Sequence, residues 1–401
     1  MSTAEASRGL STVATSRPAP RADDARGPWI HGRLWDAVWI QSALWLVPLA
    51  FLLANGYRDL DDSPFGVLVF ALTALLWLAH RFGSTWLAYA TTAYHPLVRA
   101  EPLRFVVVPI AITAVCFAIM LPADHVLPLT RVERVIALAT IDFVFVTWHF
   151  AAQHFGILSL YRMRAGRKAD RWTRRVDRLF TLGLGGAVVV VVEAITRTDL
   201  FQEIWVPPWI AKDWLPAVSE TLRIGAMGSV LAITVAVLAF EALASRTSLP
   251  RVLYVAGVAL MVGGALWLGQ PYLFVAVWTV QHWLAATALT TRVASAEPVP
   301  HGSVARRALH AVNRRPWALL AVLASLSVLL LPVMEIESVR VEGVYYGERL
   351  FGELAIGLRE STWVPALVAL GFTTGFLHYW LDRAVFRFSR PAVRVAARGL
   401  L

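Results

Sequence analysis

Charge and cysteine are both scarce in this sequence, and each shortage excludes a class of protein. Charged residues make up 16% of the 401 residues, whereas hydrophobic residues make up 57%. Soluble domains carry about 25% charged residues, so the composition excludes an ordinary soluble protein. The single cysteine, Cys116, excludes an intrachain disulfide and a cysteine-based metal motif. Because it lies in an apolar run, we expect it to be a small core residue.

Several functional motifs are also missing. No nucleophile elbow, phosphate-cradling loop or nucleic-acid-binding motif occurs. The net charge is +10, but the arginines gather in short connections between apolar runs, as a membrane-topology signal requires, so we expect no nucleic-acid partner. Residues 1–28 are rich in Ala, Ser, Arg and Pro and lack the apolar core of a secretory signal, which predicts a disordered cytoplasmic tail.

Long apolar runs are what the sequence has instead. About 20 apolar residues cross a bilayer as a helix, and these runs are continuous rather than alternating, which favours helices over a barrel. The sequence therefore predicts an all-α, polytopic membrane helix bundle of about ten transmembrane helices over residues 29–390, followed by a cytoplasmic tail at residues 391–401. The ten runs cover residues 34–54, 64–89, 103–121, 132–161, 176–195, 218–243, 252–268, 272–290, 317–334 and 361–386.

The distribution of arginine predicts the orientation of these spans. With both termini in the cytoplasm, the internal connections after residues 161 and 290 are rich in arginine, whereas the external sequence GYRDLDDS is net acidic. This asymmetry follows the positive-inside rule. We expect an integral protein of a bacterial inner membrane, with the lipid bilayer as its partner. Two long external connections, residues 197–220 and 335–360, are predicted to lie at the membrane surface.

Histidines interrupt four of the apolar runs. A polar side chain inside a membrane helix costs free energy and is a functional-site candidate by default. His80, His149, His282 and His378 lie in four spans that all run from outside to inside. At about 1.5 Å per residue, each lies roughly 12–18 Å from the cytoplasmic end of its span. We therefore predict that these four imidazoles meet around a metal ion.

Neighbouring polar residues extend this predicted site. Asp382 follows His378 by four residues and can either bind the metal or orient a facing imidazole. Asp142 shares one helix face with His149. His154 lies about 140° around the helix from His149, so one metal takes both only if the helix is distorted. We predict His149, His154 and Asp382 as the catalytic residues.

A substrate contact is predicted at the cytoplasmic mouth of the site. Tyr161, Arg162 and Arg383 lie there, and guanidinium groups suit the phosphate or carboxylate of an anionic head group. The histidines outside the spans are expected to be solvated side chains without a site. They are His31, His125, His301 and His310.

The predicted ligands identify a class of metal and a class of chemistry. A set of nitrogen and oxygen ligands without thiolate suits iron, zinc, manganese or copper, and we expect one or two iron ions. A many-helix membrane protein with histidines clustered near its cytoplasmic face resembles the membrane histidine-box oxygenases, desaturases and hydroxylases. That resemblance implies dioxygen activation by iron against a C–H bond of a lipid-like substrate, with an electron donor as partner. The paired boxes of that family are absent, because the only close pair is His149 and His154.

Three other functions use the same residues. A haem-binding electron-transfer protein would take its axial ligands from facing histidines. A proton-coupled transporter would use Asp142, His149 and Asp382 as a proton relay. Hydrolytic zinc chemistry also remains open, because zinc and iron share these ligand types.

Overall fold

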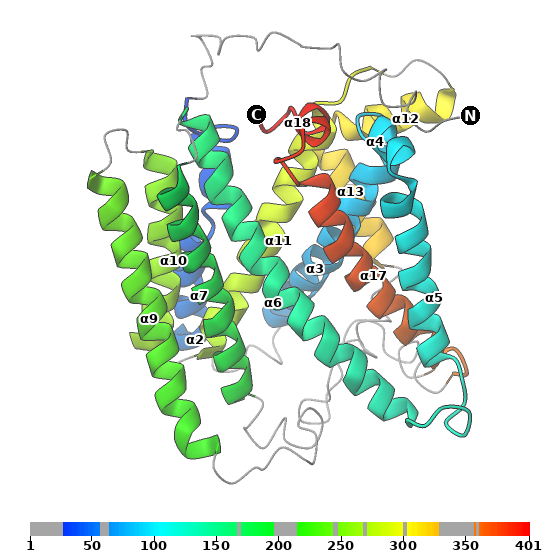
Figure 1. The fold of residues 1–401 in the computed structure, drawn as a ribbon, viewed down its shortest axis with the longest axis horizontal. Helices are drawn as coiled ribbons and strands as arrows, with labels where there is room; N and C mark the ends of the chain where they lie inside the picture. Colours follow the sequence, from blue (N-terminus) through cyan, green and yellow to red (C-terminus); the bar gives the residue numbers. More distant parts are fainter. Residues whose placement is uncertain are drawn as a thin grey trace.

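The computed structural model describes residues 27–56, 64–166, 170–195, 215–243, 248–267, 271–299, 303–328, 357 and 361–401. All the regular secondary structure in these residues is helical, and they contain no strand. The prediction of an all-α protein is therefore confirmed for the described part of the chain. Figure 1 shows a bundle of long helices with short helices at one end.

The helices follow the apolar runs closely. In chain order they are α1 (Arg33–Trp35), η2 (Asp36–Ile40), α2 (Ala43–Gly56), α3 (Pro64–Ala90), α4 (His95–Ala100), η3 (Leu103–Val107), α5 (Val108–Met120), α6 (Arg131–Arg164), α7 (Arg171–Ile195), α9 (Leu215–Leu243), α10 (Leu249–Trp267), α11 (Pro271–Ser295), α12 (Val304–Asn313), α13 (Pro316–Val328), α17 (Val364–Val385) and α18 (Pro391–Ala396).

Several of these helices are long and apolar enough to cross a membrane. They are Leu103–Met120, Arg131–Arg164, Ile224–Leu243, Leu249–Trp267 and Val364–Val385. A sixth span forms if Arg33–Ile40 and Ala43–Leu53, bent by 49° at their break, count as one. Large apolar side chains on these helices face outward, including Ile110 (63% exposed) and Leu243 (87% exposed). Such exposure is expected of a surface that contacts lipid rather than water. The full count of ten spans remains a prediction.

Helix α6 crosses the middle of the bundle. Its 34 residues extend about 51 Å. Thr130 caps its first turn: the Thr130 hydroxyl accepts the Glu133 backbone N–H, while the Glu133 carboxylate accepts the Thr130 backbone N–H. Figure 1 shows α6 and α11 between two sets of helices, with α2, α7, α9 and α10 on one side and α3, α5, α13 and α17 on the other. Residues on α6 and α11 therefore reach the centre of the bundle.

Close contact between α3 and α11 depends on a glycine. A Cβ atom at Gly83 would lie 2.7 Å from Oγ1 of Thr290, so only glycine fits there without a shift. His80 lies one turn before Gly83 on the same face of α3. The contact therefore fixes how far His80 lies from α11.

The last residues fold back onto the bundle. Residues 391–401 contain α18, and Val393, Ala397 and Leu400 are fully buried in the main core. The Gly399 carbonyl accepts a hydrogen bond from Arg292 at the end of α11. This predicted tail is therefore attached to the bundle at its end. All but the last two residues of the tail predicted over residues 1–28, and most of the connections at 197–220 and 335–360, lie outside the described residues.

Candidate metal centre

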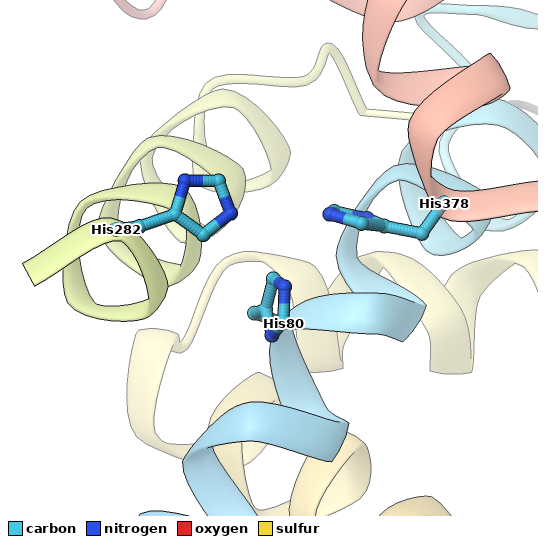
Figure 2. A group of neighbouring side chains, drawn as sticks. All are labelled: His80, His282 and His378. Atoms are coloured by element: carbon cyan, nitrogen blue, oxygen red, sulfur yellow. The ribbon is translucent and has the colours of Figure 1, made fainter. Parts of the chain in front are cut away.

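Four helices each contribute one histidine to the centre of the bundle. His80 comes from α3, His149 from α6, His282 from α11 and His378 from α17, and each is at most 5% exposed. Figure 2 shows the rings of His80, His282 and His378 pointing toward one another from their three helices. The His149 ring completes the group, with ring centroids 4.9 Å from His282 and 4.7 Å from His378. The structure thus brings together the four residues that the sequence predicted as ligands.

Two overlapping sets of side chains have ligand atoms at metal-binding spacing. One set is His80, His282 and His378, whose ligand nitrogens all lie within 4.8 Å of one another. The second set is His149, His378 and Asp382, with the same spacing. His378 belongs to both sets, so all five side chains surround one small volume.

The spacing between His149 and His378 matches that of two ligands on one ion. Their Nε2 atoms lie 3.1 Å apart. On a tetrahedral ion with metal–nitrogen bonds of about 2.0–2.1 Å, two ligand nitrogens lie about 3.3–3.4 Å apart. The observed separation is within a few tenths of an ångström of that value, so a small adjustment would admit an ion.

Two of the imidazoles are oriented as metal ligands usually are. A ligating histidine commonly donates its other ring N–H to a carbonyl or a carboxylate, which fixes the tautomer. The Nδ1–H of His80 donates to the carbonyl oxygen of Trp77 and leaves Nε2 for an ion. Nδ1 of His378 faces Oδ1 of Asp382 at 3.6 Å and the Ser84 hydroxyl at 3.4 Å, while its Nε2 faces the centre.

His282 has no hydrogen-bond partner for either ring nitrogen among the described residues. It is 0% exposed, and its ring stacks on Phe150 with centroids 3.8 Å apart. A buried polar group without a partner costs about 1–3 kcal/mol. Coordination of a cation by one of these nitrogens would offset that cost.

Aromatic rings enclose the cluster. Phe150 covers His282, Trp283 stacks on His80 with centroids 5.8 Å apart, and the Tyr379 ring lies 5.1 Å from His149. Such a shell keeps water away from the imidazoles and offers an apolar surface next to them.

His154 does not belong to either set of ligands. Trp278 donates its indole N–H to Nε2 of His154. An indole only donates, so the proton of a neutral His154 sits on Nδ1, which donates to the Tyr254 hydroxyl at 2.5 Å. Both ring nitrogens are therefore engaged by protein groups. A catalytic role for His154 stays a prediction. The two hydrogen bonds favour a structural role instead, in which His154 links α6 to α10 and α11.

Asp142, predicted from the sequence to lie beside His149, belongs to a buried ionic group with Arg81, a residue that was not predicted as part of the site. Asp142 interacts with the Arg81 guanidinium and accepts a hydrogen bond from Tyr379. Gly375 permits this approach, since a Cβ there would lie 3.3 Å from Oδ1 of Asp142. Arg81 is 8% exposed and lies over the Trp77 ring at 4.3 Å. The sequence did hold a signal for Arg81, because a charged residue in the middle of an apolar run needs a partner.

The three predicted substrate contacts differ in their surroundings. Tyr161 is 0% exposed, and Arg162 forms a buried ion pair with Asp177 at 2.7 Å. Arg251 binds the other oxygen of Asp177 at 2.5 Å, so these charges hold α6, α7 and α10 together. Head-group binding by Tyr161 and Arg162 remains a prediction, and their burial counts against it. Arg383 is exposed, with its guanidinium 5.2 Å from the Trp148 ring.

One histidine expected to be solvated is buried. His310 is 8% exposed, and its Nδ1 lies 3.0 Å from Oε1 of Glu297. The prediction was wrong because α12 packs its His310 face against the bundle end instead of leaving it in water. His31 is half-buried rather than solvated, with its ring 5.5 Å from that of Trp35. His125 is exposed as predicted, and His301 lies outside the described residues.

Comparison of this chain with protein-family models, curated proteins and solved structures gives no match, so its interpretation rests on the geometry of the site.

Proposed function

We propose that this chain is an integral membrane metalloenzyme that holds a transition metal at His80, His149, His282 and His378. Asp382 orients His378 and is available as a fifth ligand. The observation that carries this proposal is His282, which is fully buried, has neither ring nitrogen hydrogen-bonded among the described residues and faces three other imidazoles. Four desolvated imidazoles at this spacing are stabilised best by a shared cation.

One ion is favoured over two. The two ligand sets share His378, and its Nδ1 faces the Asp382 carboxylate and the Ser84 hydroxyl. Only Nε2 of His378 is then left to bind metal. The ion held by His149 and His378 is therefore the same ion that His80 and His282 approach.

The ligand set favours a metal bound directly by protein over a haem. Two axial imidazole nitrogens on opposite sides of a haem iron lie about 4 Å apart, with the flat macrocycle between them. The facing nitrogens of His149 and His378 are 3.1 Å apart, and the rings of His80 and His282 occupy the space around them. Imidazole ligands without thiolate suit iron, zinc and copper, and we propose iron.

The surroundings of the site favour an apolar substrate and redox chemistry of the oxygenase, hydroxylase or desaturase type. Aromatic rings line the imidazoles, and the nearby outer face of α6 exposes Phe145 (49%) and Trp148 (44%). A lipid-like substrate would reach such a site from the bilayer. Bound iron would supply the redox chemistry, and a separate electron donor would be its partner.

The same proposal includes ten spans with both termini in the cytoplasm of a bacterial inner membrane. Figure 1 supports one part of it, because α4, α12 and α18 lie at one end of the bundle and the α5–α6 connection lies at the other. The first end carries the arginine-rich segments, as the positive-inside rule requires of the cytoplasmic face.

Metal analysis of the purified protein tests this proposal. Wild-type protein should contain about one iron, or another transition metal, per chain. His149→Ala and His282→Ala should each lower the affinity for that metal more than 100-fold, since losing even an outer partner costs about 10–100-fold. His125→Ala, an exposed histidine far from the cluster, is the matched control and should keep full occupancy.

Two results would redirect the proposal. A Soret band in the visible spectrum that disappears in His149→Ala would identify haem as the cofactor. Wild-type protein without stoichiometric metal would remove the metalloenzyme, and the proton-coupled transporter would remain only if His149→Ala still impaired function, since His149 belongs to its proposed proton relay.

A further inference from the structure

A second candidate site lies at the basic end of the bundle, away from the histidine cluster. It is a cavity of about 330 Å³ between α4 and the segment that joins α11 to α12. Its lining residues are Thr92, His95, Pro96, Arg99, Pro298, Val299 and Arg306. Figure 1 shows α4 and α12 close together at the same end as α18.

Two arginines give this cavity its charge. Arg99 and Arg306 are exposed, and neither forms an ion pair within the described part of the chain. Two guanidinium groups that share one concave surface repel each other unless an anion lies between them. The cavity therefore holds net positive charge that the described protein does not neutralise.

The first nearby carboxylate, that of Glu297, is already occupied. Its Oε1 accepts one hydrogen bond from the Asn313 side-chain amide and lies 3.0 Å from Nδ1 of His310. Its Oε2 accepts the backbone N–H and the hydroxyl of Thr92. Glu297 thus fixes one wall of the cavity, and its oxygens are engaged by groups other than the two arginines.

The second nearby carboxylate, Glu101, is also occupied. Arg104 donates to it at 2.7 Å, and Arg390 donates to both of its oxygens at 2.5 Å. These contacts connect α4 to η3 and to the residue before α18. Neither Glu101 nor Glu297 therefore forms a direct ion pair with Arg99 or Arg306.

His95 adds a further polar group. Its Nε2–H lies 3.3 Å from the carbonyl oxygen of Tyr89. That contact leaves Nδ1 for a ligand, to which it can donate when the ring is protonated and from which it can accept when the ring is neutral. Pro96, Pro298 and Val299 (64% exposed) supply apolar walls beside these polar groups.

We propose that this cavity binds a phosphate group, held between Arg99 and Arg306 and presented by the head group of an anionic phospholipid. Paired guanidinium groups suit the geometry and charge of phosphate. Basic pockets at the cytoplasmic ends of membrane helices are where anionic head groups bind. The apolar walls and the position at the bundle end favour a lipid over a free phosphate. The proposal is independent of the metal centre.

Lipid retention after purification tests the site. Wild-type protein is reconstituted with equal amounts of phosphatidylglycerol and phosphatidylcholine, and the lipid bound to it is measured by native mass spectrometry. We expect phosphatidylglycerol to be retained preferentially. Arg99→Gln/Arg306→Gln should lower that preference about 30-fold, given the contribution expected of two arginines near an anionic lipid surface. Arg387→Gln/Arg394→Gln removes two exposed arginines from the same end of the bundle and should keep the preference.

A second variant and a second ligand complete the experiment. Arg99→Lys/Arg306→Lys keeps both charges but lacks the paired donors of guanidinium, so it should retain part of the preference even if the glutamine variant folds poorly. Equal preference in all four proteins would overturn the site. Inorganic phosphate that binds the wild type, in an Arg99- and Arg306-dependent manner, without any preference among lipids would overturn the lipid as its source.

Discussion

At the scale of single residues, the neighbours of His378 and His154 distinguish a candidate metal ligand from a histidine of the core. Asp382 faces Nδ1 of His378 at 3.6 Å and leaves Nε2 of that ring directed at His149. Trp278 instead occupies Nε2 of His154 with an indole N–H. Nε2 of His378 thus faces another imidazole, as our proposed metal centre requires, whereas both ring nitrogens of His154 belong to a hydrogen-bond network within the core.

Asp382→Asn should weaken metal binding without emptying the site. The amide keeps the size of the side chain but removes the negative charge beside His378, so we expect a 10–100-fold lower metal affinity. The measurement is competition with a chelator at several concentrations. Arg387→Gln, a change at an exposed residue just beyond the end of α17, is the control. Equal affinities in wild type and Asp382→Asn would show that Asp382 does not act on the ligands.

Trp278→Phe should lower stability and leave metal content unchanged. The substitution keeps the aromatic packing but removes the N–H that His154 accepts, so a buried acceptor loses its partner at a cost of about 1–3 kcal/mol. Thermal unfolding in detergent measures the loss, and metal analysis is performed on the same sample. Loss of metal without loss of stability would contradict the structural role and indicate that His154 contributes to metal binding.

The sequence predicted the imidazoles better than it predicted their partners. His80, His149, His282 and His378 were identifiable because each lies at a similar depth in a long apolar run. The contact between Tyr254 and His154 joins residues 100 positions apart, and it depends on how α6 and α10 pack. No local sequence pattern predicts a contact over such a distance in the chain, so the sequence did not separate His154 from the four candidate ligands.

At the scale of helices, the centre depends on how closely α3 and α11 approach each other. Gly83 and Thr290 meet at the contact between these helices, and His80 and His282 lie on the two helices that they join. The sequence showed that both segments are helices. It predicted them as neighbours only through the histidines that they carry, because side chains that complement each other between packed helices leave no periodic pattern.

Gly83→Ala should weaken metal binding although Gly83 is not one of the proposed ligands. The new Cβ would lie 2.7 Å from Oγ1 of Thr290 and 3.4 Å from its Cβ and Cγ2, so either the Thr290 side chain must rotate or the two helices must move apart. We expect a loss of about 1–3 kcal/mol of stability, as overpacking usually causes, together with weaker metal binding. Chelator competition and thermal unfolding are the measurements. Adding Thr290→Ala should restore both, and a double variant as impaired as Gly83→Ala would contradict this explanation.

At the scale of the whole molecule, the orientation that we propose in the membrane follows from the charge at the two ends of the bundle. Arginine-rich segments around α12 and α18 lie at one end, and the α5–α6 connection with exposed His125 lies at the other (Figure 1). The sequence predicted this separation because positive charge in connections is a local feature. The count of ten spans also includes segments outside the described residues, so it awaits a direct test.

Labelling of single cysteines provides that test. The chain has one cysteine, so Cys116→Ser gives a background without thiols. A membrane-impermeant maleimide applied to intact cells should label His125→Cys and spare His301→Cys, and inside-out vesicles should show the reverse. Labelling of both positions from one side would mean that an even number of spans lies between them. The proposed topology, which requires an odd number, would then be wrong.

X-ray absorption spectroscopy of the metal in purified wild-type protein tests the proposed centre most directly. We predict a coordination shell of about four imidazole nitrogens at about 2.0–2.1 Å, with the outer scattering of imidazole rings and no sulfur. His282→Ala should remove one imidazole from that shell. A metal bound through sulfur or through oxygen alone, or an unchanged imidazole count in His282→Ala, would contradict the assignment of the four histidines as ligands.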